Sequence, residues 1–143
     1  MKFQGNAVSD PGSTFPEGEY YLCCTNVQDT DKDGNPLKSK SSGLDMWILE
    51  FTVNEGDFEN RKLWHYLPFI PPAAPGHGFF LKAVKAFGWD PEGANDLFPV
   101  HIKGLVIKAK VGIDPGTDKY PEAKNVIKKF FTPDGELRKI PAL

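Results

Sequence analysis

The 143-residue sequence lacks any apolar run of about eighteen residues, the length that a membrane-spanning helix requires. Its first residues, 1–18, also lack the basic start and the apolar stretch of a secretory signal peptide. From these absences we expect a cytoplasmic protein that does not enter a membrane. The composition, 40% hydrophobic and 25% charged residues, is that of an ordinary globular domain.

Cysteine is scarce, and the two cysteines, Cys23 and Cys24, are adjacent. Neighbouring side chains on a β-strand point to opposite faces, so these thiols are poorly placed to bond to each other. They also lack the C-x-x-C spacing of zinc sites. We interpret both as small, reduced strand residues, with a redox or metal role as the weaker alternative.

Motifs of enzymatic chemistry are also missing. The sequence has no glycine-rich phosphate loop, no G-x-S-x-G and no H-E-x-x-H, and its three histidines, at 65, 77 and 101, have no metal-spaced partner. Asp29 to Gly34 copies the first half of a calcium loop, but Lys40 stands where the bidentate glutamate belongs, so we interpret the segment as a turn. We therefore expect a protein that is not an enzyme and binds no cofactor or metal.

What the sequence does have is a series of segments rich in aromatic and β-branched residues. Gly and Pro clusters separate them, and an amphipathic pattern over 79–87 predicts one short helix that stops at Gly88. Asp90-Pro91 predicts a further helical turn. The predicted strands are 19–28, 44–53, 61–69, 103–113 and 125–131.

Three strands, a helix and two more strands is the order of a five-stranded Greek-key barrel of the OB type. A β-sandwich usually needs about seven strands. We therefore predict a mainly β fold, a five-stranded OB-type barrel with one short helix between strands 3 and 4. Residues 1–15 are expected to form a flexible N-terminal arm and residues 16–143 a single domain.

The predicted third strand carries two aromatic residues beside a cation. Lys62, Trp64 and Tyr66 share one face, and Leu63 and Leu67 share the other. Because the lysine marks the solvent side, Trp64 and Tyr66 are candidates for an exposed stacking platform. The alternative is that a bulge reverses the assignment and places the tryptophan in the core.

Basic residues recur on the last two strands. Alternate apolar positions from 105 to 113 define an inward face, so Lys108 and Lys110 must project outward. Strand 44–53 is different, because both of its faces are apolar and its inward face stays open. The net charge is −2, but residues 1–60 hold four lysines and eleven carboxylates, whereas residues 61–143 hold thirteen basic and eight acidic residues.

Sequence-tolerant binding of a nucleic acid strand requires aromatic faces for the bases and cations for the phosphates. The residue pattern supplies both, and Tyr120 adds an aromatic side chain in the loop between the last two strands. We expect single-stranded DNA as the partner. The candidate nucleic-acid-binding residues are Arg61, Lys62, Trp64, Tyr66, Lys108, Lys110, Tyr120, Lys128 and Lys129.

Short motifs add a family resemblance. They are PEGEY at 16–20, LEFTV at 49–53, NRKLW at 60–64, KGLVIKAKV at 103–111 and YP…NV over 120–126. With them, residues 15–132 resemble phage and prophage OB-fold single-stranded-DNA-binding proteins, formerly classed as a domain of unknown function. The resemblance implies a protein that coats phage DNA in the bacterial host without sequence preference. It also implies replication or recombination proteins as partners, and places Arg61, Trp64, Lys108 and Lys110 at the recurrent basic and aromatic positions.

Two other functions stay open at this point. A β-rich surface with many aromatic residues also suits a phage protein-interaction or assembly module that binds no nucleic acid. Carbohydrate recognition by stacking is a third option. Oligomeric state and the choice between DNA and RNA are also open.

Overall fold

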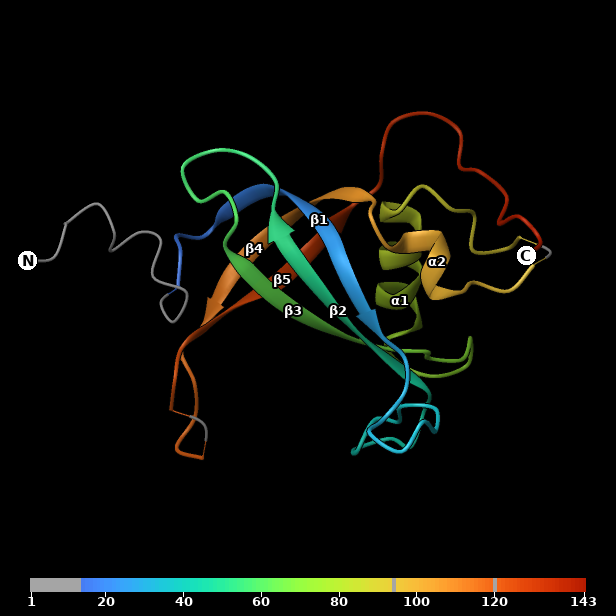
Figure 1. The fold of residues 1–143 in the computed structure, drawn as a ribbon, viewed down its shortest axis with the longest axis horizontal. Helices are drawn as coiled ribbons and strands as arrows, with labels where there is room; N and C mark the ends of the chain where they lie inside the picture. The colour runs from blue at the N-terminus through green and yellow to red at the C-terminus, as the bar shows by residue number, and fades with distance from the viewer. Residues whose placement is uncertain (1–13, 94, 120) are drawn as a thin grey trace, which may run out of the picture.

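The computed structural model describes residues 14–93, 95–119 and 121–143. They form a mainly β structure with one five-stranded antiparallel sheet in the order β3-β2-β1-β4-β5. Each predicted strand is present within three residues of its expected ends. The elements are β1 (Gly18–Gln28), β2 (Met46–Val53), β3 (Lys62–Pro68), α1 (His77–Ala86), α2 (Pro99–Ile102), β4 (Val106–Asp114) and β5 (Lys124–Phe131) (Figure 1).

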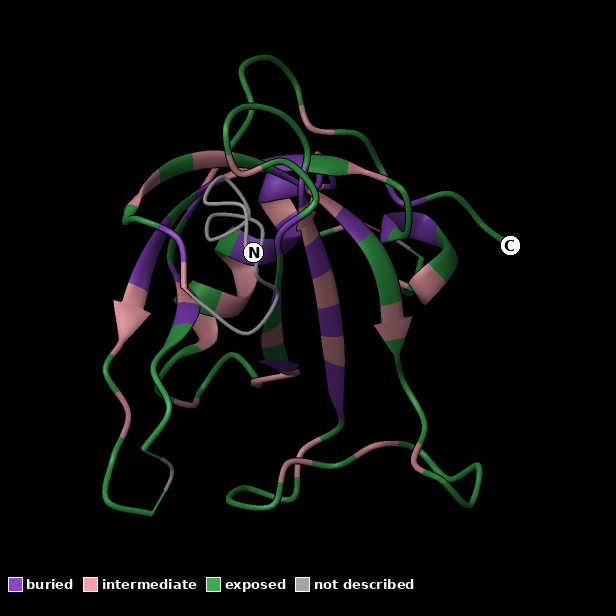
Figure 2. Ribbon diagram, turned by 60° about the vertical axis from the view of Figure 1, so that its left-hand side comes forward, coloured by how far each residue is buried: buried purple, intermediate pink, exposed green. Residues whose placement is uncertain are grey.

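β2 shows which of its two apolar faces points inward. Trp47, Leu49, Phe51 and Val53 are buried, whereas the side chains between them are less buried, and this alternation is visible along the strand (Figure 2). Ile48 lies on the outer face, opposite Tyr66 of β3. The outward position of Ile48 explains why the sequence pattern left this strand undecided.

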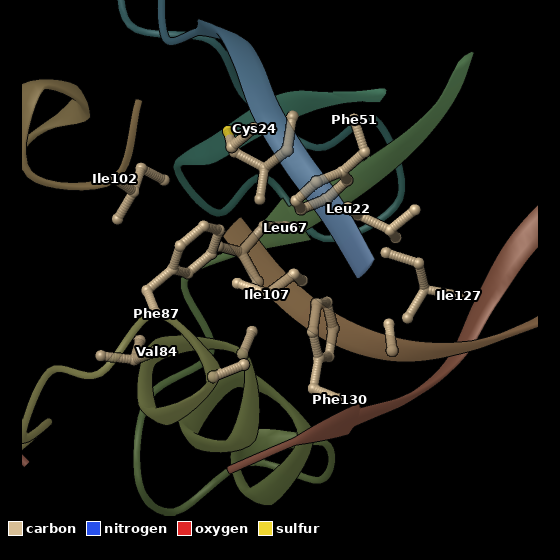
Figure 3. Close-up of a cluster of buried hydrophobic side chains, with 14 of the residues drawn as sticks. Leu22, Cys24, Phe51, Leu67, Val84, Phe87, Ile102, Ile107, Ile127 and Phe130 are labelled. Atoms are coloured by element: carbon tan, nitrogen blue, oxygen red, sulfur yellow. The ribbon is translucent and has the colours of Figure 1, made fainter. Parts of the chain in front are cut away.

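The core lies between the concave face of the sheet and α1 (Figure 3). Leu22 and Phe51 from the sheet are fully buried, and Val84 and Phe87 meet them from α1 and its C-terminal end. Burying each such side chain stabilises the fold by about 1.5–3 kcal/mol. Gly88 follows with φ of 87°, a left-handed conformation that suits glycine and ends the helix where the sequence predicted.

The two outer strands of the sheet, β3 and β5, approach each other through aromatic side chains. The rings of His65 on β3 and Phe130 on β5 are 5.1 Å apart between centroids and meet edge to face. Phe79 of α1 contacts both, at 5.8 Å from His65 and 5.6 Å from Phe130. The sheet is therefore strongly curved, and α1 stands at one end of it (Figure 1), where Phe79 contacts both outer strands.

The connection between β3 and β4 differs from the prediction, because it holds two helices. The second, α2, begins at Pro99, whose missing N–H suits the first helical position. The helical turn predicted after Asp90-Pro91 is wrong. The Asp90 carboxylate accepts a hydrogen bond from the Glu92 N–H at 2.9 Å and closes a tight turn there instead.

The N-terminal boundary also differs from the prediction. Phe15, expected at the end of a flexible arm, is 2% exposed and belongs to the core. Asn125 of β5 holds its backbone: the amide donates to the Phe15 carbonyl at 2.9 Å, and the amide oxygen accepts from the Phe15 N–H at 3.0 Å. The rest of the predicted arm, residues 1–13, lies outside the described residues.

Two local predictions are confirmed. The Asp31 carboxylate accepts hydrogen bonds from the N–H groups of Asp33 and Asn35, so the segment that resembles a calcium loop is a turn. Cys24 points into the core and Cys23 to the outer face, and both are free thiols. Burial raises the pKa of the Cys24 thiol to about 12. No helix in the described part of the chain is long and apolar enough to cross a membrane.

Replacing Asn125 by alanine is expected to destabilise the fold by about 2–4 kcal/mol, because the buried backbone N–H and carbonyl of Phe15 lose their partners. Urea denaturation measures this free energy of unfolding. Asn26→Ala, at an exposed position on β1, is the control and should change it by less than about 0.5 kcal/mol. Equal effects of the two substitutions would contradict the role assigned to Asn125.

Candidate nucleic-acid interface

The outer face of β3 presents the two aromatic side chains that the sequence singled out. Trp64 is 52% exposed and Tyr66 61% exposed, while Leu63 and Leu67 on the opposite face are each 2% exposed. The alternation of β3 is therefore unbroken, and the alternative of a core tryptophan is wrong. Large aromatic side chains with this exposure are available to stack on a planar ligand.

Polar neighbours on β2 surround this pair. Glu50 lies opposite Trp64, and Thr52 lies opposite Lys62. The Lys62 ammonium is 3.7 Å from the Glu50 carboxylate and 3.3 Å from the Thr52 hydroxyl. This exposed ion pair contributes at most about 1 kcal/mol, so a phosphate group can compete for the lysine.

A groove of about 550 Å³ runs between β3 and the beginning of β5. We call it the aromatic groove and define it by Lys62, Trp64, Tyr66, Lys124 and Val126, which line it. Its volume falls in the range of about 300–1,000 Å³ that small-ligand sites occupy. The groove therefore combines two aromatic side chains with one lysine from each of its strands.

His65 lies beneath this groove, on the inward side of β3. It is half-buried between Phe79 and Phe130, and this burial lowers its pKa to about 4. Its ring is therefore neutral at pH 7 and supplies apolar packing. The cations of the groove come from its lysines.

A second surface covers the outer face of β1, β4 and β5. In the register of the sheet, Lys108 of β4 lies opposite Tyr21 of β1 and opposite Phe131 of β5. Two residues further along β4, Lys110 lies opposite Lys129 of β5. We call these five residues the lysine stripe. It brings together three of the predicted cations and flanks one of them with an aromatic side chain on each side.

Two of the three lysines of this stripe, Lys108 and Lys129, lie over aromatic rings. The Lys108 ammonium is 5.9 Å from the centre of the Tyr21 ring and 5.5 Å from that of Phe131, and the Lys129 ammonium is 5.1 Å from Phe131. Lys108 also lies 3.3 Å from the Glu19 carboxylate. That pair is exposed and contributes at most about 1 kcal/mol, which leaves Lys108 able to exchange partners.

Lys128 occupies a bulge in β5, where the pairing register with β4 shifts. The bulge leaves Lys128 and Lys129 both exposed. The Lys128 side chain crosses over Gly112, where an added Cβ would come within 2.6 Å of it. Glycine at this position therefore gives the lysine stem its room.

The structure separates the predicted residues into these two surfaces. β2 and β1 lie between β3 and β4 in the sheet order, so Trp64 and Tyr66 are not direct neighbours of Lys108 and Lys110. The single set of candidate residues therefore divides between two surfaces.

Of the remaining predicted residues, Lys128 lies on the bulge and Arg61 belongs to neither surface. Arg61 is 6% exposed, with its guanidinium 5.6 Å from the centre of the Phe15 ring, so the expectation of an exposed arginine is wrong. Arg61 is buried because it packs against Phe15, a residue distant in sequence. Tyr120 lies outside the described residues.

Four residues of these surfaces were missed by the sequence prediction: Tyr21, Lys124, Val126 and Phe131. Tyr21 could have been found, because alternation along β1 places it on the same outward face as Glu19. Phe131 could not, because the bulge at Lys128 breaks the alternation of β5. Lys124 was left in a loop, since the strand begins one residue earlier than predicted.

These observations define a mainly β protein with two exposed surfaces that combine aromatic and basic side chains. No protein-family model matches the chain, and no curated protein sequence matches it either.

The low pKa of His65 makes stability depend on pH. In the unfolded chain this histidine titrates near 6.5, so between pH 6.5 and 4 the unfolded state binds the extra proton. The contribution of His65 to the free energy of unfolding is complete above about pH 6.5. It decreases by about 2–3 kcal/mol as the pH falls toward 4. Urea denaturation across this window should show a smaller loss for His65→Phe. An unchanged pH dependence in that variant would assign the effect to other groups.

Proposed function

We propose that this protein binds single-stranded DNA without sequence preference and performs no catalysis. The observation that carries the proposal is the exposed pair Trp64 and Tyr66, which borders a groove with lysines on both sides. Base stacking on an aromatic side chain contributes about 1–3 kcal/mol per base and tolerates any base, because each base has a π-face. Such a platform has no need of hydrogen bonds to base edges.

The topology supports an OB-type barrel as the fold behind this function. β1 pairs with both β2 and β4, all pairs are antiparallel, and the helices lie between β3 and β4. β3 and β5 converge at His65 and Phe130, where such a barrel closes. In OB folds the face carrying strands 2 and 3, together with the loops after strands 1 and 4, binds oligonucleotides. The aromatic groove is lined by β3 and by residues of the loop after β4, which supports this comparison. The loops after β1 and β4 both extend toward the bottom of the view in Figures 1 and 2.

A phage origin, action in the bacterial cytoplasm, and partners in replication or recombination belong to the same proposal. They rest on the short motifs at 16–20, 49–53, 60–64, 103–111 and 120–126. Three of these motifs include residues of the groove or the stripe. NRKLW contains Lys62 and Trp64, KGLVIKAKV contains Lys108 and Lys110, and YP…NV contains Val126.

Titration of fluorescently labelled oligo-dT, followed by fluorescence polarisation, tests this function. Trp64→Ala and Tyr66→Ala should each weaken binding by about 1–3 kcal/mol per stacked base while leaving the thermal unfolding midpoint unchanged. Phe98→Ala, at an exposed aromatic residue that lies outside both surfaces, is the control and should bind as the wild type does. Absence of wild-type binding at low salt would contradict the function itself.

The salt dependence of binding provides a second test. Because each lysine that contacts a phosphate releases counterions, the logarithm of affinity should fall linearly with the logarithm of salt concentration. Lys62→Ala and Lys124→Ala should each reduce that slope by about 0.7, the value for one contact to a single strand. A slope that stays the same in both variants would remove these lysines from the interface.

The same titrations separate the alternatives. A protein-interaction module would not bind oligo-dT, and a carbohydrate-binding protein would release oligo-dT to a competing oligosaccharide. Tight binding that increases with oligonucleotide length is expected for the DNA-binding function only.

A further inference from the structure

The lysine stripe lies away from the aromatic groove, yet it repeats the groove's combination of cations and aromatic rings. Tyr21 is 47% exposed, and neither Lys110 nor Lys129 forms an ion pair with any residue in the described part of the chain. Two ammonium groups on neighbouring strands that form no ion pair among the described residues, on the same face as the exposed Tyr21 ring, match what a phosphate backbone with bases requires.

A hollow of about 460 Å³ adjoins this stripe and gives the rings access to a ligand. Tyr21, Lys108 and Phe131 line it, together with the turn from Thr132 to Asp134. The exposed face of Tyr21 is therefore next to a concave surface, where an inserted base can stack and lie beside the Lys108 ammonium. This concavity distinguishes the stripe from an ordinary solvated patch of lysines.

β5 connects the two surfaces. Its first residues, Lys124 and Val126, line the aromatic groove, and its last outward residues, Lys129 and Phe131, belong to the stripe. Between them, Lys128 is exposed on the bulge, so cations occur along the whole strand. At a rise of about 3.3 Å per residue, the eight residues of β5 cover roughly 23 Å, the length of about seven nucleotides at stacked spacing.

We propose that the binding site is bipartite: a single strand of DNA that fills the aromatic groove continues along β5 and ends on the lysine stripe. A short oligonucleotide occupies the groove only. A longer one also stacks on Tyr21 and neutralises its phosphates with Lys108, Lys110 and Lys129. This inference rests on the proposed single-stranded-DNA-binding function and extends it to the outer face of β1, β4 and β5.

The test compares oligo-dT of about three nucleotides, too short to extend from the groove to Lys129, with oligo-dT of about twenty nucleotides, which can cover both surfaces. The double variant Lys108→Ala/Lys129→Ala should bind the long oligonucleotide about tenfold more weakly, with a salt slope smaller by about 1.4, and bind the short one as the wild type does. Tyr21→Ala should likewise weaken only the long complex, by at least about fivefold.

Two controls accompany these variants. Lys82→Ala/Lys103→Ala removes the same charge from exposed positions on and after the helices and should leave both affinities within about twofold of the wild type. Trp64→Ala should weaken the short and the long complex alike. Circular dichroism melting establishes that each variant is folded before its affinity is interpreted.

The outcomes distinguish this inference from the function on which it rests. If the wild type binds neither oligonucleotide, the proposed function fails, and the bipartite site fails with it. If the wild type binds both and the stripe variants weaken neither, the groove is the whole site and the inference is wrong. Equal weakening of the short and the long complex would also overturn it, because the stripe would then belong to the primary contact.

Discussion

The edge-to-face contact between His65 and Phe130 holds together two strands that lie at opposite ends of the sheet order. Phe79 fixes the same contact from α1. Because this cluster occupies the inward side of β3, the alternation of the strand leaves Trp64 and Tyr66 on the outside. The groove beside them exists only because β3 and β5 approach each other at this point. The proposed stacking surface therefore depends on an aromatic contact on the opposite side of the same strand.

The same cluster links the groove to the rest of the molecule. A neutral imidazole packs among aromatic rings without the desolvation cost that a charged ring would carry. Charge is placed instead on lysines at the rim and along β5, where water remains available to them. A chain with net charge −2 thereby presents basic surfaces locally, so its overall charge says little about its partner.

Much of the fold was predictable from the sequence because alternation on single strands is a local property. The lysine at position 62 was enough to orient β3, and apolar residues on alternate positions oriented β4. The predictions that were wrong depend on interactions between segments distant in the sequence. Arg61 is buried against Phe15, which joins the core through Asn125, and no local pattern contains that contact. The separation of the candidate site into two surfaces follows from strand order, which periodicity along one strand cannot reveal.

The two hydrogen bonds between Phe15 and Asn125 join residues that lie 110 positions apart in the sequence. Contacts of such long range form late, since the chain must close a large loop before they can contribute. During synthesis on the ribosome, Phe15 emerges early and can pack against Tyr20 and Phe58, but Asn125 follows only when β5 is made. Until then the backbone N–H and carbonyl of Phe15 lack the hydrogen-bond partner that the finished fold gives them, and β4 lacks its neighbour β5. Incomplete chains of this kind carry an unpaired strand edge and are the aggregation-prone species that a chaperone would bind.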